Sequence, residues 1–217
     1  MSHNALGEGV VRLQRIGLMG GSFNPIHCGH LNLGRACLSG GYAESVLFLP
    51  SGNPPHKRQG LADKRDRLRM VELALSGEAG MGVCREEIER EGVIYTVDTL
   101  GILREKMPGC AFLYMIGADS LRQLHTWKQP ENIIRQCTLL VAMRPGEDRE
   151  STMETARRWR LRGAEIELMD APLMDVSSTG IRDRIARGQG LDGLVPGCVE
   201  AYIREKGLYL TDEEDAR

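Results

Sequence analysis

The sequence contains no C-x-x-C pair, although it has six cysteines, at positions 28, 37, 84, 110, 137 and 198. A zinc ribbon or a dithiol redox pair needs that close spacing, so neither is expected here. Scattered cysteines in a chain of this size fit a reducing cytosol better than a framework of disulfides.

Long apolar runs are also missing, because no stretch approaches the roughly 20 residues that cross a bilayer. The N-terminal stretch MSHNALGEGVVRLQR lacks the apolar centre of a secretion signal. We therefore expect a cytoplasmic protein with no membrane partner. A large excess of charge of one sign is also missing, because the chain has 28 basic and 30 acidic residues and a formal net charge of -2. That balance argues against a protein that coats nucleic acid, but it permits a small basic site for an anionic ligand.

Internal repeats, low-complexity tracts and linkers are absent from the sequence as well. The 217 residues, 41% of them hydrophobic, are enough for one substantial domain and few for two. We expect a flexible lead-in over residues 1–14, a single domain over residues 15–210 and an acidic tail over residues 211–217.

Short apolar runs alternate with helical patterns along the chain. Strands are predicted at residues 15–19, 45–50, 82–90, 110–117, 138–143 and 164–169. Helices are predicted at residues 31–38, 63–76, 96–106, 151–162, 178–187 and 196–206. This alternation predicts an α/β fold with a mainly parallel sheet flanked by helices. Ligands of such sheets bind at the carboxyl ends of the strands, so the loops at 20–30, 52–57 and 116–120 are expected to converge on one rim.

The loop GGSFNPIHCGH, residues 20–30, joins a predicted strand to a predicted helix. Its glycines let backbone N–H groups approach a phosphate, and a helix N-terminus adds positive partial charge. The loop matches neither G-x-G-x-x-G nor G-x-x-x-x-G-K-[ST], so the usual dinucleotide and P-loop interpretations fail. His27 and His30 stand three residues apart and would share a face of the helix. Both imidazoles can then donate hydrogen bonds to one set of phosphates, which this pattern favours over a helix cap and a packed ring.

Further motifs follow in order along the chain. They are GGSFNPIHCGHLNLG (20–34), PSGNPPHK (50–57), YTVDTL (95–100), IGADSL (116–121), Trp127-Lys128, RPG (144–146), VSSTGIR (176–182) and LVPGCVEAYIREKGLY (194–209). Taken together, they resemble bacterial nicotinate-nucleotide adenylyltransferases, which belong to the nucleotidyltransferases with an H-x-G-H motif. H-x-G-H and S-S-T-x-I-R mark the wider superfamily, whereas G-S-F-N-P-I-H with P-P-H-K and Y-T-V-D-T-L is more specific.

The resemblance implies a Rossmann-like nucleotidyltransferase fold and an enzyme of NAD biosynthesis. The family reaction joins nicotinate mononucleotide to the AMP part of ATP and gives nicotinate adenine dinucleotide (deamido-NAD) and pyrophosphate. The resemblance also implies small-molecule substrates, no nucleic-acid partner, and Mg²⁺ as the working metal that accompanies ATP. We predict no metal ligands among the protein's own residues.

The resemblance also assigns roles to individual residues. The predicted catalytic residues are His27, His30 and Arg182. The predicted ATP-binding residues are Gly20, Gly21, Ser22, Phe23, His27, His30, Gly117, Asp119, Ser177, Ser178 and Arg182. The predicted mononucleotide-binding residues are Asn24, Lys57, Thr96 and Trp127.

Several of these residues also have a purely structural explanation. Ser177 or Ser178 suits a helix N-cap, a role that can coexist with phosphate binding. Asp119 can cap the next helix instead of accepting a hydrogen bond from a ribose hydroxyl. Trp127 is either a core residue or an indole that stacks on the pyridine ring, and Lys57 is either solvated or bound to a phosphate.

Three alternatives remain at this point. The first is an adenylyltransferase for another phosphate, such as nicotinamide mononucleotide or phosphopantetheine; an enzyme for phosphopantetheine is not expected to carry YTVDTL or the Trp127 segment. The second is a fragment of a class I aminoacyl-tRNA synthetase, which the lack of a K-M-S-K-S-like segment disfavours. The third is a non-catalytic nucleotide sensor, which the intact His27, His30 and Arg182 disfavour.

Overall fold

Six parallel strands form one sheet in the computed structural model, which describes residues 13–52, 60–144, 146–172 and 174–210. The strands are β1 (Gln14–Gly21), β2 (Ser45–Pro50), β3 (Met81–Val83), β4 (Cys110–Gly117), β5 (Thr138–Met143) and β6 (Ile166–Asp170). Their order across the sheet is β3-β2-β1-β4-β5-β6. The predicted α/β fold with a parallel sheet is therefore confirmed. The lead-in and the acidic tail expected at the two ends fall largely outside the described residues.

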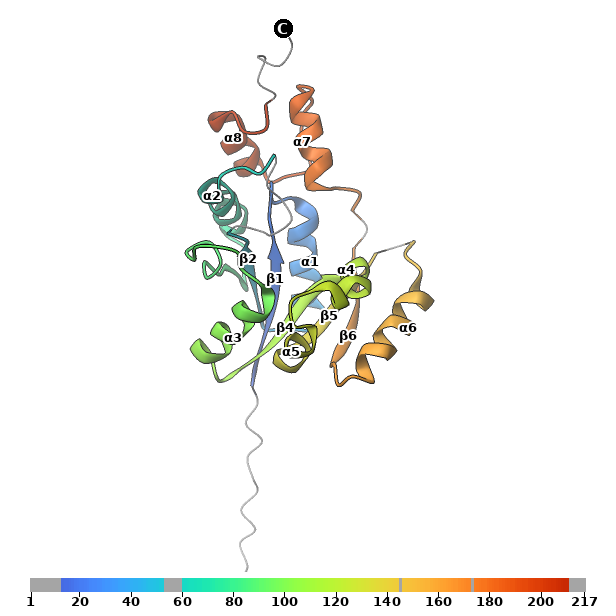
Figure 1. Cartoon of the computed structure of the whole chain (residues 1–217). Coiled ribbons are helices and arrows are strands. Elements are labelled where there is room, and N and C mark those ends of the chain that lie inside the picture. The colour runs from blue at the N-terminus through green and yellow to red at the C-terminus, as the bar shows by residue number, and fades with distance from the viewer. Residues whose placement is uncertain (1–12, 53–59, 145, 173, 211–217) are drawn as a thin grey trace, which may run out of the picture.

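Helices cover both faces of the sheet. They are α1 (Cys28–Ser39), α2 (Lys64–Leu75), α3 (Thr96–Lys106), α4 (Ala118–Gln123), the 3₁₀ turn η1 (Leu124–Thr126), α5 (Pro130–Gln136), α6 (Arg149–Arg160), α7 (Ser178–Ala186) and α8 (Gly197–Lys206). One buried cluster lies between the sheet and α1, α2, α7 and α8, and a second lies between the sheet and α3 to α6. In Figure 1, α7 and α8 lie beyond the end of the sheet to which the β1 arrow points.

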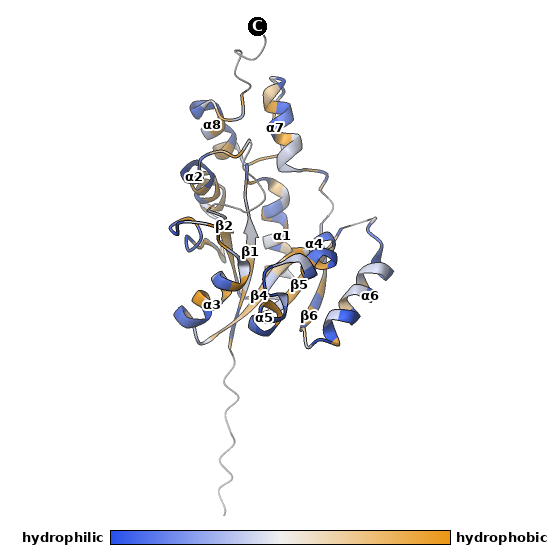
Figure 2. Ribbon diagram, viewed as in Figure 1, coloured by the Kyte–Doolittle hydropathy of each residue, from blue (hydrophilic) through white to orange (hydrophobic). Residues whose placement is uncertain are grey.

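The central strand β1 is apolar on both sides because both layers pack on it. Leu18 pairs in register with Leu47 of β2 and with Tyr114 of β4. Gly17 brings α1 close, since a Cβ there would lie 3.2 Å from Val46 Cγ2 and 3.3 Å from Cys37 Sγ. Figure 2 shows the same pattern, with hydrophobic residues concentrated on the strands and hydrophilic ones on the outer sides of the helices.

The strand predicted over residues 82–90 is largely wrong. β3 ends at Val83, and the last backbone bond to β2 runs from Cys84 N–H to the Phe48 carbonyl. The chain then turns inward, where Glu87 is buried and accepts a hydrogen bond from Thr99 Oγ1 at 3.0 Å. A buried acidic side chain held by α3 cannot be recognised from an exposed-looking run of charges. The short elements α4, η1 and α5 were not predicted either.

The order of the strands creates one switch point, between β1 and β4. The chain leaves β1 toward α1 on one face and leaves β4 toward α4 on the other, so the carboxyl ends of these neighbours diverge. The loops after β1 and β4 therefore lie on one rim, as expected, and the described start of the loop after β2 lies beside them. Among the described residues, no helix is long and apolar enough to span a membrane.

Candidate active site

His27 and His30 stack on each other at the N-terminus of α1. Their ring centroids are 3.7 Å apart at an interplanar angle of 26°. His27 is the N-cap residue, with extended backbone, and its carbonyl accepts the His30 N–H at 2.9 Å. The His27 backbone N–H in turn donates to His30 Nδ1 at 3.2 Å. Because Nδ1 accepts this bond, a neutral His30 carries its proton on Nε2.

Both histidines are neutral near pH 7 in the free protein. Burial, helped by the positive charge of Arg144, lowers the pKa of His27 to about 4. Burial also lowers the pKa of His30 well below its usual value, and the charges of His27 and Arg144 add to that effect. The pair therefore presents N–H donors rather than cations until an anion arrives.

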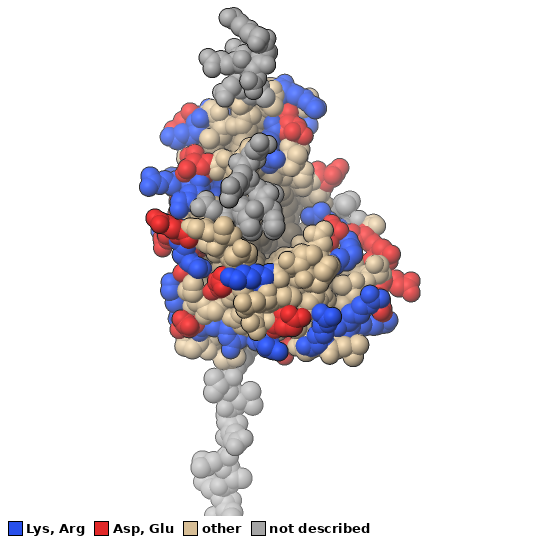
Figure 3. Space-filling model, in the orientation of Figure 1, with Lys and Arg blue, Asp and Glu red and all other residues tan. Residues whose placement is uncertain are grey.

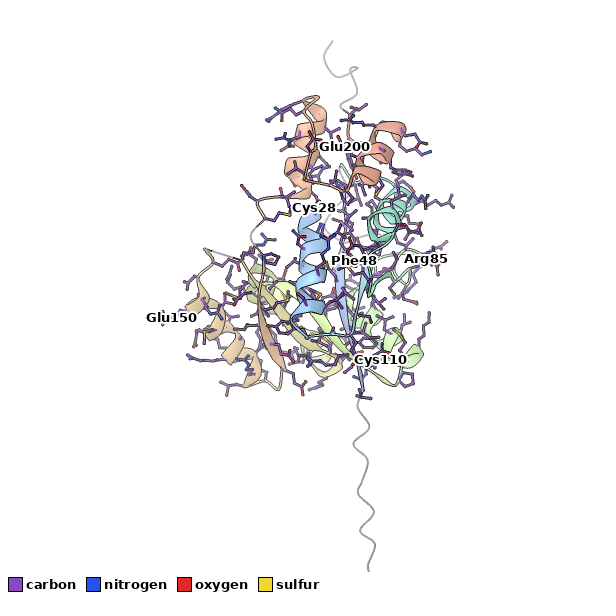
Figure 4. All side chains as sticks on the ribbon, turned by 180° about the vertical axis from the view of Figure 1, so that it is seen from behind. Cys28, Phe48, Arg85, Cys110, Glu150 and Glu200 are labelled. Atoms are coloured by element: carbon purple, nitrogen blue, oxygen red, sulfur yellow. The ribbon has the colours of Figure 1, made fainter. Side chains whose placement is uncertain are left out.

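Gly29, the third residue of H-x-G-H, leaves room for this pair. A Cβ at Gly29 would lie 2.9 Å from Val176 Cγ1 and 3.0 Å from His27 Nδ1. Cys28, the variable residue of the motif, marks the same end of α1 in the rear view of Figure 4, below the two C-terminal helices. The small residue thus lets the segment before α7 pack directly against the histidine pair.

Phe23 is predicted to bind ATP, but its ring is 1% exposed and faces the protein. The ring meets His30 edge-on at a centroid distance of 5.0 Å and also contacts Phe48. Its backbone has φ of 45°, a left-handed conformation that turns the loop after β1. The Phe23 side chain therefore supports His30, and the contact of Phe23 with ATP stays a prediction.

The N-terminus of α7 is attached to the loop after β1. Ser177 caps α7 by accepting the Gly180 N–H at 3.1 Å, as the structural explanation predicted. Ser178 Oγ donates to the Pro25 carbonyl at 2.9 Å, and Arg182 Nη1 donates to the Asn24 carbonyl at 2.8 Å. The structure therefore brings Ser178 and Arg182 to the same loop as His27 and His30.

Arg144 was not predicted as a site residue. It follows β5 directly, and its charge acts on both His27 and His30. The tripeptide RPG after a predicted strand was the available signal in the sequence, but only the parallel order of β4 and β5 brings it to this rim.

Residues after β4 line the other side of the switch point. Gly117 ends β4, and a Cβ there would meet nothing within 4 Å. Asp119 lies in the first turn of α4, is highly exposed and pairs with Arg122. Trp127 is half-buried, and its ring meets Tyr114 edge-on at 6.1 Å. Tyr114 in turn lies 3.4 Å from Thr96 Oγ1 through its hydroxyl, so Thr96 and Trp127 border the same tyrosine.

Asn24 is predicted to contact the mononucleotide, but its side chain is 4% exposed. Its amide donates to the Gly60 carbonyl at 2.8 Å and accepts the Ala62 N–H at 3.0 Å. Tyr209 Oη donates to the same oxygen at 2.9 Å. The Asn24 side chain therefore connects segments of the protein, and the contact of Asn24 with the mononucleotide stays a prediction. Lys57 lies outside the described residues.

The face that carries these loops is hollowed in Figure 3, between the part with α7 and α8 and the part with α4. No group of three or more His, Cys, Asp or Glu side chains within the described part of the chain could hold a metal ion. Donors to an anion predominate among the site side chains: two imidazoles and two guanidinium groups. The arrangement can hold phosphates in line and neutralise charge that develops on them.

Comparison with known proteins gives a consistent result. The model of the cytidylyltransferase-like family matches residues 18–184. A "Probable nicotinate-nucleotide adenylyltransferase" of Neisseria meningitidis serogroup B is 41% identical over 200 residues, which cover 91% of this chain and 99% of the relative. A protein of the same name from Halalkalibacterium halodurans is 39% identical over 203 residues, which cover 93% and 94% of the two chains.

Solved structures are similar in fold. Plasmodium falciparum nicotinic acid mononucleotide adenylyltransferase complexed with NaAD aligns with a TM-score of 0.75 at 17% identity, covering 90% of this chain and 97% of that one. The same enzyme complexed with APC aligns with a TM-score of 0.69 over the same shares of both chains. At such low identity the likeness establishes the shared architecture.

Proposed function

This chain belongs to the nicotinate-nucleotide adenylyltransferases within the cytidylyltransferase-like family, and we propose from that premise that it transfers the adenylyl group of ATP to nicotinate mononucleotide. The products are nicotinate adenine dinucleotide and pyrophosphate, in NAD biosynthesis. The observation that carries this proposal at the site is the stacked pair of His27 and His30 beyond the carboxyl end of β1.

The reaction brings two anions together. An oxygen of the mononucleotide phosphate attacks the α-phosphorus of ATP, and the bond from that phosphorus to the bridging oxygen of the β-phosphate breaks. The attacking phosphate is already ionised, so no general base and no covalent enzyme intermediate are required. Catalysis then consists of in-line positioning and stabilisation of charge at the α-phosphate.

His30 is proposed to hold the α-phosphate through Nε2–H. Support comes from the bond between the His27 N–H and His30 Nδ1, which fixes the proton on the other nitrogen. His27 is proposed to contact the outer phosphates from the adjacent position in the stack. The negative charge of a bound phosphate favours the protonated form of a histidine. A bound phosphate therefore raises the pKa values of both rings from their lowered values.

Arg182, Ser178 and Arg144 are proposed to bind the β- and γ-phosphates. Arg182 donates one hydrogen bond to the loop after β1 and has further N–H donors for a phosphate. The Ser178 hydroxyl already donates its one proton to the Pro25 carbonyl, so Ser178 is proposed to act through its backbone N–H. The backbone of Gly20, Gly21, Ser22 and Phe23 and the first turn of α7 after Ser177 are proposed to add N–H donors. Removing one preorganised donor of this kind usually lowers the rate by about 10²- to 10³-fold.

The remaining residues divide between the adenosine and the acceptor. Gly117 and Asp119 are proposed to lie against the adenosine, with Asp119 accepting from a ribose hydroxyl once it parts from Arg122. Thr96 and Trp127 are proposed to form the nicotinate side, with the indole stacked on the pyridine ring. Lys57 is proposed to contact a phosphate. We further propose a cytoplasmic location, which the scattered cysteines support.

Mg²⁺ is proposed to arrive as part of the ATP substrate. Mg²⁺ usually keeps several of its waters and binds substrate phosphates through few protein ligands. The donor set of this site, dominated by imidazole and guanidinium, fits the phosphates rather than the metal ion.

The experiment that tests this function offers ATP and Mg²⁺ with one acceptor at a time. Pyrophosphate release is measured with nicotinate mononucleotide, nicotinamide mononucleotide and phosphopantetheine, and a reaction without acceptor is the control. We expect the fastest release with nicotinate mononucleotide. Faster release with phosphopantetheine, or none with any acceptor, would refute the proposal.

A further inference from the structure

Arg67, in α2, is the largest of the fully buried side chains of the described residues, at 0% exposure. A guanidinium taken out of water is destabilising unless its donors are paired. An apolar side chain of similar volume would fill the same space without that penalty. The presence of a buried cation therefore calls for a task other than filling the core.

Three segments meet on this guanidinium. Nη1 donates to the Ser22 carbonyl at 2.7 Å, Nη2 donates to the Gly52 carbonyl at 2.8 Å, and Nε donates to the Ala62 carbonyl at 3.1 Å. All three acceptors are backbone oxygens, and none belongs to α2 itself. Ser22 follows β1 and Gly52 follows β2, so one planar group joins the ends of two neighbouring strands to the start of a helix.

Further contacts hold the same two loops around Arg67. Ala62 is bound at both sides of its backbone, because its N–H donates to Asn24 Oδ1 while its carbonyl accepts from Arg67. The Ser51 N–H donates to the Gly21 carbonyl at 2.9 Å. Gly52 has no room for a side chain, since a Cβ there would lie 2.4 Å from the Glu87 carbonyl oxygen. Gly52 is thus confined between Arg67 and the segment after β3.

We propose that Arg67 is a positioning residue for adenylyl transfer: it fixes the loop after β1 relative to the loop after β2, and thereby the two substrate phosphates relative to each other. This inference rests on the function proposed above, in which the first loop binds ATP. In the same proposed function, the second loop carries Lys57, which contacts a phosphate. A displacement of about 1 Å between reacting groups can cost about 10²-fold in rate, so a rigid connection between the loops acts mainly on kcat.

Two substitutions at Arg67 and one matched control test the proposal. Arg67→Met keeps a comparable volume without donors, and Arg67→Lys keeps the charge but cannot reach all three carbonyls. Met70→Ala removes another fully buried side chain of α2, one that has no hydrogen-bond donor. We expect kcat to fall by about 10-fold or more in Arg67→Met and by less in Arg67→Lys, with KM for ATP changed by less than about 3-fold. Met70→Ala should lose melting temperature and keep its kcat.

Hydrogen exchange of backbone amides supplies a readout that does not depend on turnover. The amides of Ser51 and Ala62 should exchange faster in Arg67→Met, relative to those of β4, and should not do so in Met70→Ala. Unchanged exchange at these amides, or a loss of kcat that merely follows the loss of melting temperature in all three variants, would overturn the proposal. If the unmodified protein released no pyrophosphate with any acceptor, the proposed function would fail, and the exchange rates alone would decide whether Arg67 holds the two loops.

Discussion

His30 is held by neighbours that each fix a different property of its ring. The His27 backbone N–H donates to Nδ1 and so fixes the tautomer of His30. The His27 ring covers one face of the His30 ring, and Phe23 meets the His30 ring edge-on, so both limit its rotation. Together they fix the orientation of the His30 ring, and so of Nε2–H, before any ligand binds. Preorganisation of this kind avoids reorganisation at the moment of reaction, which is the reason that such donors are effective.

Replacing His30 by alanine should therefore affect turnover far more than folding. We expect kcat of His30→Ala to fall by about 10²-fold or more, because the donor acts mainly in the transition state. His125→Ala, at an exposed histidine, is the matched control. Steady-state kinetics alongside thermal melting check this, and a folded His30→Ala variant with near-normal kcat would return His30 to the role of a helix cap.

Trp127 is half-buried and its ring meets Tyr114 edge-on, so part of the side chain is accessible. Trp127→Ala should raise KM for nicotinate mononucleotide several-fold to tens-fold, since an aromatic pair contributes roughly 0.5–1.5 kcal/mol beyond area burial. Affinity for ATP should change little. Trp159, a core residue of α6, is the control, because Trp159→Ala should cost about 3–5 kcal/mol of stability without such selectivity. A large drop in the melting temperature of Trp127→Ala without a selective rise in KM would exclude stacking.

The lowered pKa of His27 predicts how stability depends on pH. Between about 4 and the ordinary value of 6.5, the unfolded chain binds this proton more readily than the folded protein does. The free energy of unfolding therefore rises with pH through this window, by about 2 kcal/mol between pH 5 and pH 7 from His27 alone. Urea denaturation of the protein and of His27→Gln at both pH values measures this difference. An unchanged pH dependence in His27→Gln would contradict the burial of a neutral His27.

At the scale of elements, the site is made by the ends of helices and strands. The N-termini of α1 and α7 face the same loop after β1, so the positive ends of both helix dipoles lie beside it. At Gly29, Val176 of the segment leading to α7 approaches the first turn of α1 so closely that a Cβ on the glycine would lie 2.9 Å from Val176 Cγ1. The distance between the two helix ends is therefore set by a residue without a side chain.

Gly29→Ala should disturb this approach. Alanine favours a helix by roughly 0.5–1 kcal/mol over glycine, but its methyl group would displace the Val176 and His27 side chains. We expect kcat to fall by about 10-fold, because the histidine pair moves relative to α7. Gly101→Ala in α3 is the control, since a Cβ there has only an ordinary 3.5 Å contact with Gln136. Normal turnover in Gly29→Ala, measured at saturating substrates, would show that the spacing is not critical.

Sequence patterns predicted most elements, and the exceptions have physical causes. The bounds of β2, α3, β4 and β5 agree with the predicted ones. The three strands are continuous, largely buried apolar runs, and α3 buries one face at the helical period, so both patterns can be read from the sequence. The stretch 82–90 was wrong because α3 draws Glu87 inward. The roles of Arg67 and Arg144 could not be predicted, because the groups on which these side chains act belong to segments distant in the chain. The side-chain partners of Asn24, which are Gly60, Ala62 and Tyr209, could not be predicted for the same reason.

At the scale of the whole molecule, the C-terminal part of the described chain is hydrogen-bonded to the N-terminal part. Tyr209 Oη reaches Asn24 Oδ1 across 185 positions, and Tyr202 Oη of α8 donates to Asp66 Oδ1 of α2 at 2.8 Å. Figure 1 shows α7 and α8 beyond the carboxyl end of β1, with α8 next to α2, which lies beside the sheet. The switch point between β1 and β4 opens the crevice, and the C-terminal helices frame one side of it.

The most direct test of this account is the rate at which the protein forms a dinucleotide from ATP and a mononucleotide. Products are separated and identified by mass after incubation with ATP, Mg²⁺ and equal concentrations of nicotinate or nicotinamide mononucleotide. The account predicts nicotinate adenine dinucleotide, formed with matching pyrophosphate and about 10²-fold more slowly by His30→Ala. The absence of that dinucleotide, or its formation at the same rate by a folded His30→Ala variant, would contradict the central claim.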